Sequence, residues 1–329
     1  MTKDNGKLDR VLVLEVARVT EAAAVAASRF RGRGNEMAAD NAAVEAMHRE
    51  LAKVAIRGTV VIGEGDEGEV SHLYVDEAVG SGEGPEVDIA VDPLEGTNIC
   101  AKALPSALSV LAITERGGML RTPNMYMNKI AIGPGYPEGI ADLAAPPADT
   151  LSALAKAKGV PVSEIMCCIL DRPRHAELIR SVRETGAGVR LIPDGDVAGV
   201  IWTTQSQDTG VDVYMGIGGA REGIIAAAAL RCIGGQMQGR LVPMNQDEKV
   251  AMSRAGITDR ARKYQLGDMV SGDVIFAATG VTDGSLLAGV RCRGGVAETE
   301  TIVLRSETGT ARRIKTTFRD PGEHKGPVT

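Results

Sequence analysis

Residues 87–97 read VDIAVDPLEGT, a short apolar run that ends in two carboxylates and a hydroxyl. The apolar part, 87–91, predicts a β-strand, and the proline after Asp92 ends it. Asp92 and Glu95 stand three residues apart in the turn that follows, so both carboxylates can point to one side. Thr97 comes directly after them, with a hydroxyl placed to orient an attacking water. The segment therefore predicts a strand whose carboxyl end carries a metal site.

A second acidic turn follows another predicted strand. This strand, Thr59–Ile62, leads into Gly63–Gly68, which reads GEGDEG and contains Glu64. If the two strands are neighbours, Glu64 converges with Asp92 and Glu95, and hard cations such as Mg²⁺ and Mn²⁺ bind such groups of oxygen ligands. The same turn fits the GxGxxG pattern of dinucleotide sites, but its three carboxylates would repel a pyrophosphate. We interpret the turn as part of the metal site.

Three later strands are each predicted to end in a loop that suits an anionic sugar. They are strand 165–170 before Arg172-Pro173-Arg174, strand 189–192 before Asp194-Gly195-Asp196, and strand 211–215 before the glycine-rich run 216–223. Arginine forks bind phosphate, acidic pairs accept bonds from hydroxyls, and free backbone N–H groups before a helix cradle phosphate. Structural interpretations stay open: an exposed helix start, an N-cap at Asp196, or a helix-dipole role for Glu222. Open α/β sheets bind ligands at the carboxyl ends of their strands, which favours a binding site.

The order of elements predicts an α/β fold in two halves. Apolar spacing predicts a first helix from Leu12 to Phe30 and a second helix soon after it. Beyond residue 165, strands and helices alternate, which predicts βαβ units. The Pro- and Gly-rich stretch Gly133–Leu151 is the predicted connection between the halves. The expected organisation is an N-terminal metal-site half, 1–160, a C-terminal substrate-binding half, 161–319, and a polar tail, 320–329.

Composition excludes several classes of protein. The chain has 329 residues, 44% of them hydrophobic, and a net charge of −6, which argues against a nucleic-acid binder. No apolar run approaches the roughly 18 residues of a membrane span, and the N-terminus has no signal-peptide stretch. Five cysteines without a CxxC pair predict reduced thiols and a cytoplasmic protein. Phosphate-loop, HExxH and GxSxG motifs are missing, and the four histidines are too scattered to suggest a histidine metal site.

The motifs resemble a known family. Residues 92–97 resemble the DPxDGT signature of the metal-dependent, lithium-sensitive phosphatase superfamily, with Glu95 in place of the usual second Asp. Longer stretches, between about Val16 and Arg313, resemble the class II fructose-1,6-bisphosphatases of the GlpX type. These are GRGNEMAAD at 32–40, GTVVIGEG at 58–65, VDIAVDPLEGT at 87–97, MYMNKIAIGPG at 125–135, LDRPRH at 170–175, IPDGDVAG at 192–199 and GIGGAREG at 216–223.

The resemblance implies a layered α/β/α/β/α sandwich with the active site between its halves. It implies hydrolysis of the 1-phosphate of fructose 1,6-bisphosphate by a metal-activated water, with Mg²⁺ or Mn²⁺, in gluconeogenesis and glycerol metabolism. Some members of the family also act on sedoheptulose 1,7-bisphosphate. We expect a homo-oligomer, a dimer or a tetramer, without nucleic-acid or membrane partners. Two alternatives stay open: an inositol- or nucleotide-phosphate hydrolase of the same superfamily, and a non-catalytic sugar-phosphate sensor.

Carried over by position, the resemblance also implies residue roles. The metal ligands would be Asp40, Glu64, Asp92, Glu95 and Glu222. Thr97 and Glu95, with a neighbouring carboxylate for which Asp66 is the candidate, would act on the water. The substrate would contact Glu95, Gly96, Thr97, Tyr126, Arg172, Pro173, Arg174, Asp194, Gly195, Asp196 and Gly219.

This chain departs from the family pattern in a few places. The loop at 64–74 reads EGDEGEVSHLY where the family has EGExDxAPMLY, so Gly68 stands at the position of an Asp important for catalysis. Glu36 replaces a common Lys, Arg172 stands where some members have Lys, and Arg221 replaces the usual Pro. The first departure predicts a changed arrangement for activating water. The others are expected to tune substrate affinity.

Overall fold

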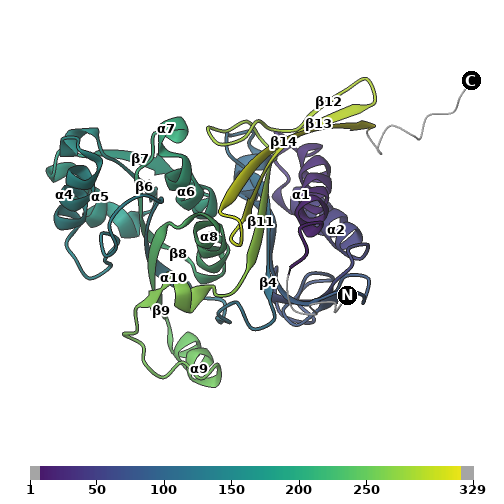
Figure 1. Cartoon of the computed structure of the whole chain (residues 1–329), viewed down its shortest axis with the longest axis horizontal. Helices are drawn as coiled ribbons and strands as arrows, with labels where there is room; N and C mark the ends of the chain where they lie inside the picture. Colours follow the sequence, from purple (N-terminus) through teal and green to yellow (C-terminus); the bar gives the residue numbers. More distant parts are fainter. Residues whose placement is uncertain (1–7, 320–329) are drawn as a thin grey trace, which may run out of the picture.

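The computed structural model describes residues 8–319, which form two β-sheets and three layers of helices (Figure 1). The predicted polar tail, 320–329, lies outside the described residues. The first helix, α1 (Leu12–Ser28), begins and ends close to its predicted bounds, and α2 (Glu36–Leu51) follows after the glycine-containing break. The Asn35 side chain caps α2 by accepting a bond from the Ala38 backbone N–H at 3.0 Å.

The first sheet joins strands from both ends of the chain. Its order is β12-β13-β11-β4-β3-β1-β2, with β14 paired to β13. The N-terminal strands are β1 (Arg57–Ile62), β2 (Ala78–Val79), β3 (Glu86–Glu95) and β4 (Leu108–Glu115), and the C-terminal ones are β11 (Val274–Gly280), β12 (Arg291–Arg293), β13 (Val296–Arg305) and β14 (Thr310–Arg319). Central β11 and β4 pair antiparallel, with Ala277 opposite Leu111. Residues far apart in the sequence therefore share one sheet.

The second sheet has the order β10-β9-β5-β8-β6-β7. Its strands are β5 (Tyr126–Ile132), β6 (Met166–Leu170), β7 (Gly188–Ile192), β8 (Val213–Gly219), β9 (Gln236–Val242) and β10 (Tyr264–Gln265). Helices α4 (Pro147–Lys158) and α5 (Ala176–Glu184) cover its outer face, and the short α7 (Ser206–Thr209), α9 (Gln246–Arg254) and α10 (Leu266–Met269) lie at its edges. β6 runs parallel to both β7 and β8, which confirms the predicted βαβ units.

Two helices fill the space between the sheets. α6 (Asp196–Trp202) and α8 (Ala220–Ile233) share one apolar core with strands of both sheets. Along β4 the side chains alternate: Ala112 packs in this central core, whereas Ile113 packs in the core beneath α1 and α2. Figure 1 shows the resulting order of helices, sheet, helices, sheet and helices. The predicted α/β/α/β/α sandwich is confirmed.

The chain crosses between the sheets at points that differ from the predicted connection. β5 already belongs to the second sheet, so the crossing precedes it, and Gly133–Leu151 lies wholly on the second sheet's side. β11 to β14 then return to the first sheet, which therefore holds strands from both sides of residue 160. Interpreting Gly133–Leu151 as the link between halves was wrong, because a Pro- and Gly-rich composition marks a loop but not the sheets that its flanking strands join.

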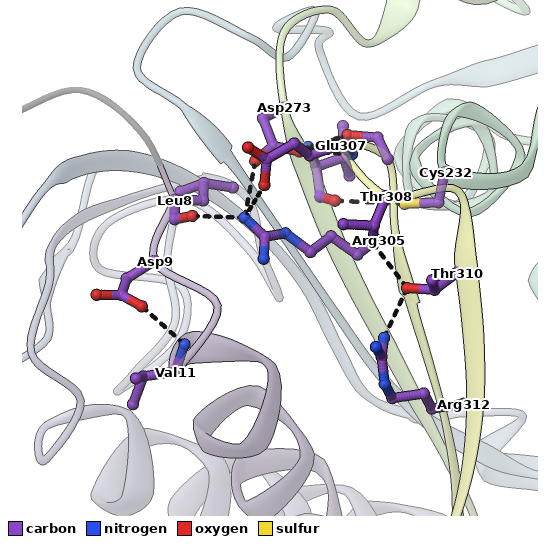
Figure 2. Close-up of polar contacts among 12 residues, drawn as sticks. Leu8, Asp9, Val11, Cys232, Asp273, Arg305, Glu307, Thr308, Thr310 and Arg312 are labelled. Atoms are coloured by element: carbon purple, nitrogen blue, oxygen red, sulfur yellow. Dashed lines mark hydrogen bonds and ion pairs between the residues drawn. The ribbon is translucent and has the colours of Figure 1, made fainter. Parts of the chain in front are cut away.

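Leu8, the first residue that the structure describes, is held by the first sheet (Figure 2). Arg305, on β13, donates to the backbone oxygen of Leu8 at 2.9 Å and lies 3.7 Å from Asp273. Its side chain is only 8% exposed, so the contact is sheltered from water. Within residues 8–319 no helix is both long and apolar enough to cross a membrane.

Candidate active site

The two acidic strand ends lie side by side. β1 and β3 are parallel neighbours, with Ile62 opposite Ala90, so Glu64, just beyond β1, lies beside Asp92. β3 continues through Pro93 to Glu95, so the prediction that this proline ends the strand was wrong. A register shift against β4 between Asp92 and Glu95 accommodates the proline within the strand. The predicted convergence of these carboxylates is confirmed. Helix α2 adds Asp40 from outside the sheet, and the first turn of α8 adds Glu222 from the central layer.

A cavity of about 350 Å³ gathers these groups. It is lined by the residues predicted as metal ligands or as reacting-phosphate contacts, which are Asp40, Glu64, Asp92, Glu95, Gly96, Thr97 and Glu222. Asp194, predicted to bind sugar hydroxyls, also lines it. Asn124 and Arg221 line the cavity as well. Asn124, which precedes β5, was not predicted, and a single exposed amide carries no sequence signal of its own.

Burial and mutual repulsion disfavour charge on these carboxylates. Burial, and then the charges of Asp40 and Glu222, raise the pKa of Glu64 from 4.5 to about 8. Burial and the charge of Glu64 raise the pKa of Asp92 well above its ordinary value, and burial and Asp92 do the same for Glu95. Such a group of oxygens fits divalent hard cations, which would offset the repulsion.

Positive φ and close packing require glycine at two places in this site. Gly96 has φ 82° between β3 and the short α3 (Thr97–Ala101), which turns the chain so that Thr97 lines the cavity. At Gly219, a Cβ atom would lie 1.8 Å from a carboxylate oxygen of Glu222. A side chain there would displace Glu222.

The run Gly216–Gly219 is part of β8 and not a free loop. Its residues pair with β5, with Gly219 opposite Tyr126. Pairing with β5 occupies alternate backbone groups of this run, whereas the Ile217 N–H faces away from β5 and donates to His175. The predicted phosphate contact at Gly219 stays a prediction. The first-turn N–H groups of α8 remain at the cavity, since no side chain caps that helix.

Lys129 is a buried cation that the sequence reading missed. It lies on β5 with 1% of its side chain exposed, pairs with Asp196, and donates to the Gly219 carbonyl at 2.8 Å. Asp196 is the first residue of α6 and not its N-cap, because left-handed Gly195 occupies the cap position. The Glu95 carboxylate instead accepts a hydrogen bond from the free Val197 N–H in the first turn of α6, at 2.8 Å. A lysine inside the apolar run MYMNKIAI was the available signal.

The predicted sugar-phosphate contacts form a group beside the cavity without lining it. Arg174 lies over the Tyr126 ring at 4.9 Å and donates to the Ile217 carbonyl at 2.7 Å. Arg172 lies 3.7 Å from Asp194, whose own side chain lines the cavity. Pro173, Gly195, Asp196 and Gly219 also lie outside the lining.

His175 fixes the loop that carries the two arginines. Its Nδ1 is 2.7 Å from the Leu170 carbonyl, and its Nε2 accepts the Ile217 N–H at 2.8 Å. An imidazole that accepts a backbone N–H is neutral, and burial lowers the pKa of His175 accordingly. This histidine ties the end of β6 to β8.

The altered loop reaches the cavity through Arg221. Asp66 is exposed and lies 3.3 Å from the Arg221 guanidinium, which also donates to the Gly63 carbonyl at 3.2 Å. Asp66 does not line the cavity itself, and its catalytic role stays a prediction. Gly68 has φ 88° and open space around its Cα.

The raised pKa of Glu64 predicts how stability depends on pH. The unfolded chain releases this proton near pH 4.5 and the folded, metal-free chain near pH 8, so stability falls as pH rises through that window. We expect Glu64→Gln to raise the Tm of the metal-free protein by about 2 °C or more at about pH 8, and to change it little at about pH 5. Thermal unfolding in chelator at both pH values measures this, with exposed Glu184→Gln as the control. An equal Tm change at both values would contradict the assignment.

Comparisons with known proteins agree with the motifs. The sequence profile of the family described as "Bacterial fructose-1,6-bisphosphatase, glpX-encoded" matches residues 10–318. Fructose-1,6-bisphosphatase 1 class 2 of Escherichia coli (strain K12) is 44% identical over 319 residues, covering 93% of this chain and 94% of that protein. Fructose-1,6-bisphosphatase class 2 of Shigella flexneri gives the same identity and coverage. The resemblance is confirmed, and the chain belongs to the bacterial, glpX-encoded fructose-1,6-bisphosphatase family.

Proposed function

We propose that this chain hydrolyses the 1-phosphate of fructose 1,6-bisphosphate to give fructose 6-phosphate and inorganic phosphate. The observation that carries the proposal is one cavity lined by the five carboxylates Asp40, Glu64, Asp92, Glu95 and Glu222, with Thr97 beside them. Membership of the family supports the same reaction, as does the 44% identity to named class 2 enzymes. The reaction belongs to sugar-phosphate metabolism and gluconeogenesis.

The residues of the cavity suggest separate roles in metal binding and in orienting the water. The five carboxylates would hold Mg²⁺ or Mn²⁺, and their all-oxygen chemistry suits either ion. When bound, such an ion lowers the pKa of water and offsets charge on phosphoryl oxygens. In the proposed reaction, water attacks phosphorus in line with the ester oxygen, the P–O bond breaks, and the sugar leaves as an alcohol. Thr97 would orient the water. Glu95 would help to hold the metal ion, and the hydrogen bond from the Val197 N–H keeps its carboxylate in position.

The basic side of the site supports a bisphosphate substrate. Arg172 and Arg174 lie beside the cavity and not in it, which supports a role in holding a phosphate other than the one that reacts. Arg174 is oriented by the Ile217 carbonyl and by the Tyr126 ring. Asp194 lines the cavity between the two groups and would accept bonds from sugar hydroxyls.

A substrate panel tests this function. Phosphate release with Mg²⁺ or Mn²⁺ is expected to be fastest for fructose 1,6-bisphosphate, with sedoheptulose 1,7-bisphosphate as a second substrate. Inositol monophosphate and nucleotide monophosphates test the alternative hydrolases. Binding of the bisphosphate without phosphate release, in the presence of both ions, would favour the sensor alternative and overturn the proposal.

Arg174→Ala is expected to raise KM for a bisphosphate by about 10- to 100-fold. The loss of one charge-assisted hydrogen bond, about 1.5–3 kcal/mol, gives this range. A monophosphate that lacks the distal group should respond little. Arg180→Ala is the matched control, because that arginine forms ion pairs with Glu177 and Glu184 on the exposed side of α5, away from the cavity. Equal losses on both substrates would instead assign Arg174 to the reacting phosphate or to structure.

The acidic loop is expected to contribute to kcat more than to KM. If Asp66 acts on the water, Asp66→Asn should lower kcat by about tenfold or more, since general-base assistance is worth about 10²–10⁴-fold. Gly68→Asp should raise kcat, or leave it unchanged if Asp66 already serves. The left-handed backbone at Gly68 tolerates Asp better than most residues, and its surroundings are open. Glu67→Gln and Glu69→Gln complete the set, and unchanged kcat in all four variants would show that the loop is structural.

The homo-oligomer and the cytoplasmic location are further parts of the proposal. Val11, which precedes α1, and Leu14 on α1 are 61% and 54% exposed, which supports a contact between copies of the chain. Light scattering coupled to gel filtration tests for a dimer or a tetramer. Cys100, Cys167, Cys168 and Cys232 are buried without disulfides, which supports a reducing location.

A further inference from the structure

Two histidines and a glutamate gather outside the carboxylate cavity. His48 lies near the end of α2, and His72 and Glu77 lie in the segment after the acidic loop. One ligand atom from each lies within 4.8 Å of the others, and within residues 8–319 no other three His, Cys, Asp or Glu side chains meet this condition. The expectation that the histidines are too scattered for a metal site was therefore wrong for His48 and His72.

The distances suit a metal ion. His48 Nε2 lies 3.2 Å from Glu77 Oε1, a spacing that two ligands of one ion can have. The two imidazole rings are stacked with centroids 4.0 Å apart, so one ring must turn before both can direct a nitrogen at the same ion. Two ligands of a tetrahedral Zn²⁺ ion, each bonded at about 2.0–2.2 Å, are about 3.3–3.6 Å apart. The His48 side chain is 31% exposed and that of Glu77 10%, so the group is sheltered and still open to an ion from solvent.

The backbone around Glu77 holds its carboxylate in place. Oε2 of Glu77 accepts the Leu73 backbone N–H, which leaves Oε1 directed to His48. Leu73 and Asp76 both have positive φ, 58° and 72°, although neither is glycine. This strained turn lies between His72 and Glu77 and brings them together, and such strain concentrates at ligand sites. A hydrogen bond to the carboxylate is the type of second contact that orients metal ligands.

We propose that His48, His72 and Glu77 form a second metal site, specific for Zn²⁺ or a similar transition-metal ion. Two imidazole nitrogens and one carboxylate are a donor set that suits Zn²⁺, with water as a fourth ligand. Mg²⁺ prefers oxygen ligands, so its affinity for a site with two imidazole nitrogens is expected to be low. The two sites would thus take different ions: hard cations in the carboxylate cavity and a transition metal in this one.

An ion in this site would connect helix α2, which carries Asp40, to residues 64–77, which include Glu64. His48 shares helix α2 with Asp40. On the other side, the Leu73 carbonyl accepts the Glu64 backbone N–H at 3.0 Å, and the Asp76 N–H donates to Val60 on β1 at 2.8 Å. The bound ion would therefore hold residues 64–77 against α2. We expect slower hydrogen exchange of this loop when the ion is bound.

Metal binding to the full-length protein tests the proposal. Metal-free protein is titrated with Zn²⁺ by calorimetry in excess Mg²⁺, which competes for the carboxylate cavity. We expect one tight Zn²⁺ per chain. His48→Ala and His72→Met should each weaken this binding by at least about tenfold, because even the loss of an outer contact costs 10- to 100-fold. Co²⁺ should give the intense visible absorption of a four-coordinate site, and the imidazole proton signals of both histidines should shift.

Glu50→Gln is the matched control, since Glu50 lies on α2 close to His48 and contacts Lys53 at 2.8 Å. It should bind Zn²⁺ like the wild type. The Tm of each variant in chelator shows whether it is folded, and Glu77→Gln provides a third, independent test. Unchanged Zn²⁺ affinity in His48→Ala and His72→Met, or a wild type that binds no Zn²⁺ in excess Mg²⁺, would overturn the proposal. Because the readout is binding, the result does not depend on the proposed phosphatase activity.

Discussion

Asp92→Asn is expected to reduce kcat by about a thousandfold or more. Asp92 lines the cavity at the end of β3, beside Glu64 and Glu95. Asparagine keeps its size but removes the charge that a divalent cation requires, and such an ion is worth several kcal/mol to the transition state. The fold should survive, because relieving repulsion among buried carboxylates favours the metal-free folded state. The measurement is phosphate release from fructose 1,6-bisphosphate with saturating Mn²⁺ or Mg²⁺.

The same experiment includes a metal-removal arm. Excess chelator should abolish the activity of the wild type, and added Mg²⁺ or Mn²⁺ should restore it. Asp247→Asn, in the first turn of α9, is the control and should behave like the wild type. Full activity in excess chelator, or in Asp92→Asn, would rule out the assignment of this cavity as a metal site.

The second large effect is expected on stability. Lys129→Met should lower the free energy of unfolding by about 3–5 kcal/mol at neutral pH, because it leaves the buried carboxylate of Asp196 without its counter-charge. It also removes the donor to the Gly219 carbonyl. Urea unfolding of the metal-free protein measures the change.

Two further variants distinguish the loss of the Lys129–Asp196 ion pair from a general effect of replacing a lysine. Lys263→Met breaks a half-exposed pair with Asp142 and should cost at most about 1 kcal/mol. The double variant Lys129→Met/Asp196→Asn should recover much of the loss, since no unpaired charge remains. If Lys129→Met is as stable as the wild type, the buried pair has no structural importance.

The convergence of Glu64, Asp92 and Glu95 was predictable from the strands that carry them, whereas Asp40, on α2, was assigned to the site only through the family resemblance. The acidic residues after 59–62 and 87–91 come together since these two strands are parallel neighbours. The layered fold was predictable only through the family resemblance. Local spacing cannot indicate that β11 lies beside β4, because pairing between distant strands leaves no periodic signal.

The remaining contacts depend on tertiary placement. Lys129 on β5 forms an ion pair with Asp196 on α6. The ring of His48 on α2 packs against the ring of His72 in the loop after β1. In each case the two residues are unremarkable in their own segments, and the fold alone makes them neighbours. The glycines of β8 misled the sequence interpretation for a related reason: glycine permits both a loop and the close approach of a strand to buried side chains.

The first sheet also determines when the protein can fold during synthesis. Its central β4 is bordered by β11, and Arg305 on β13 holds the backbone at Leu8 (Figure 2). While the ribosome has yet to release these late strands, β4 has an open edge and the apolar face of α1 lacks part of its covering. Nascent chains that stop before β11 should therefore be aggregation-prone and inactive, although every carboxylate of the catalytic cavity has already been translated.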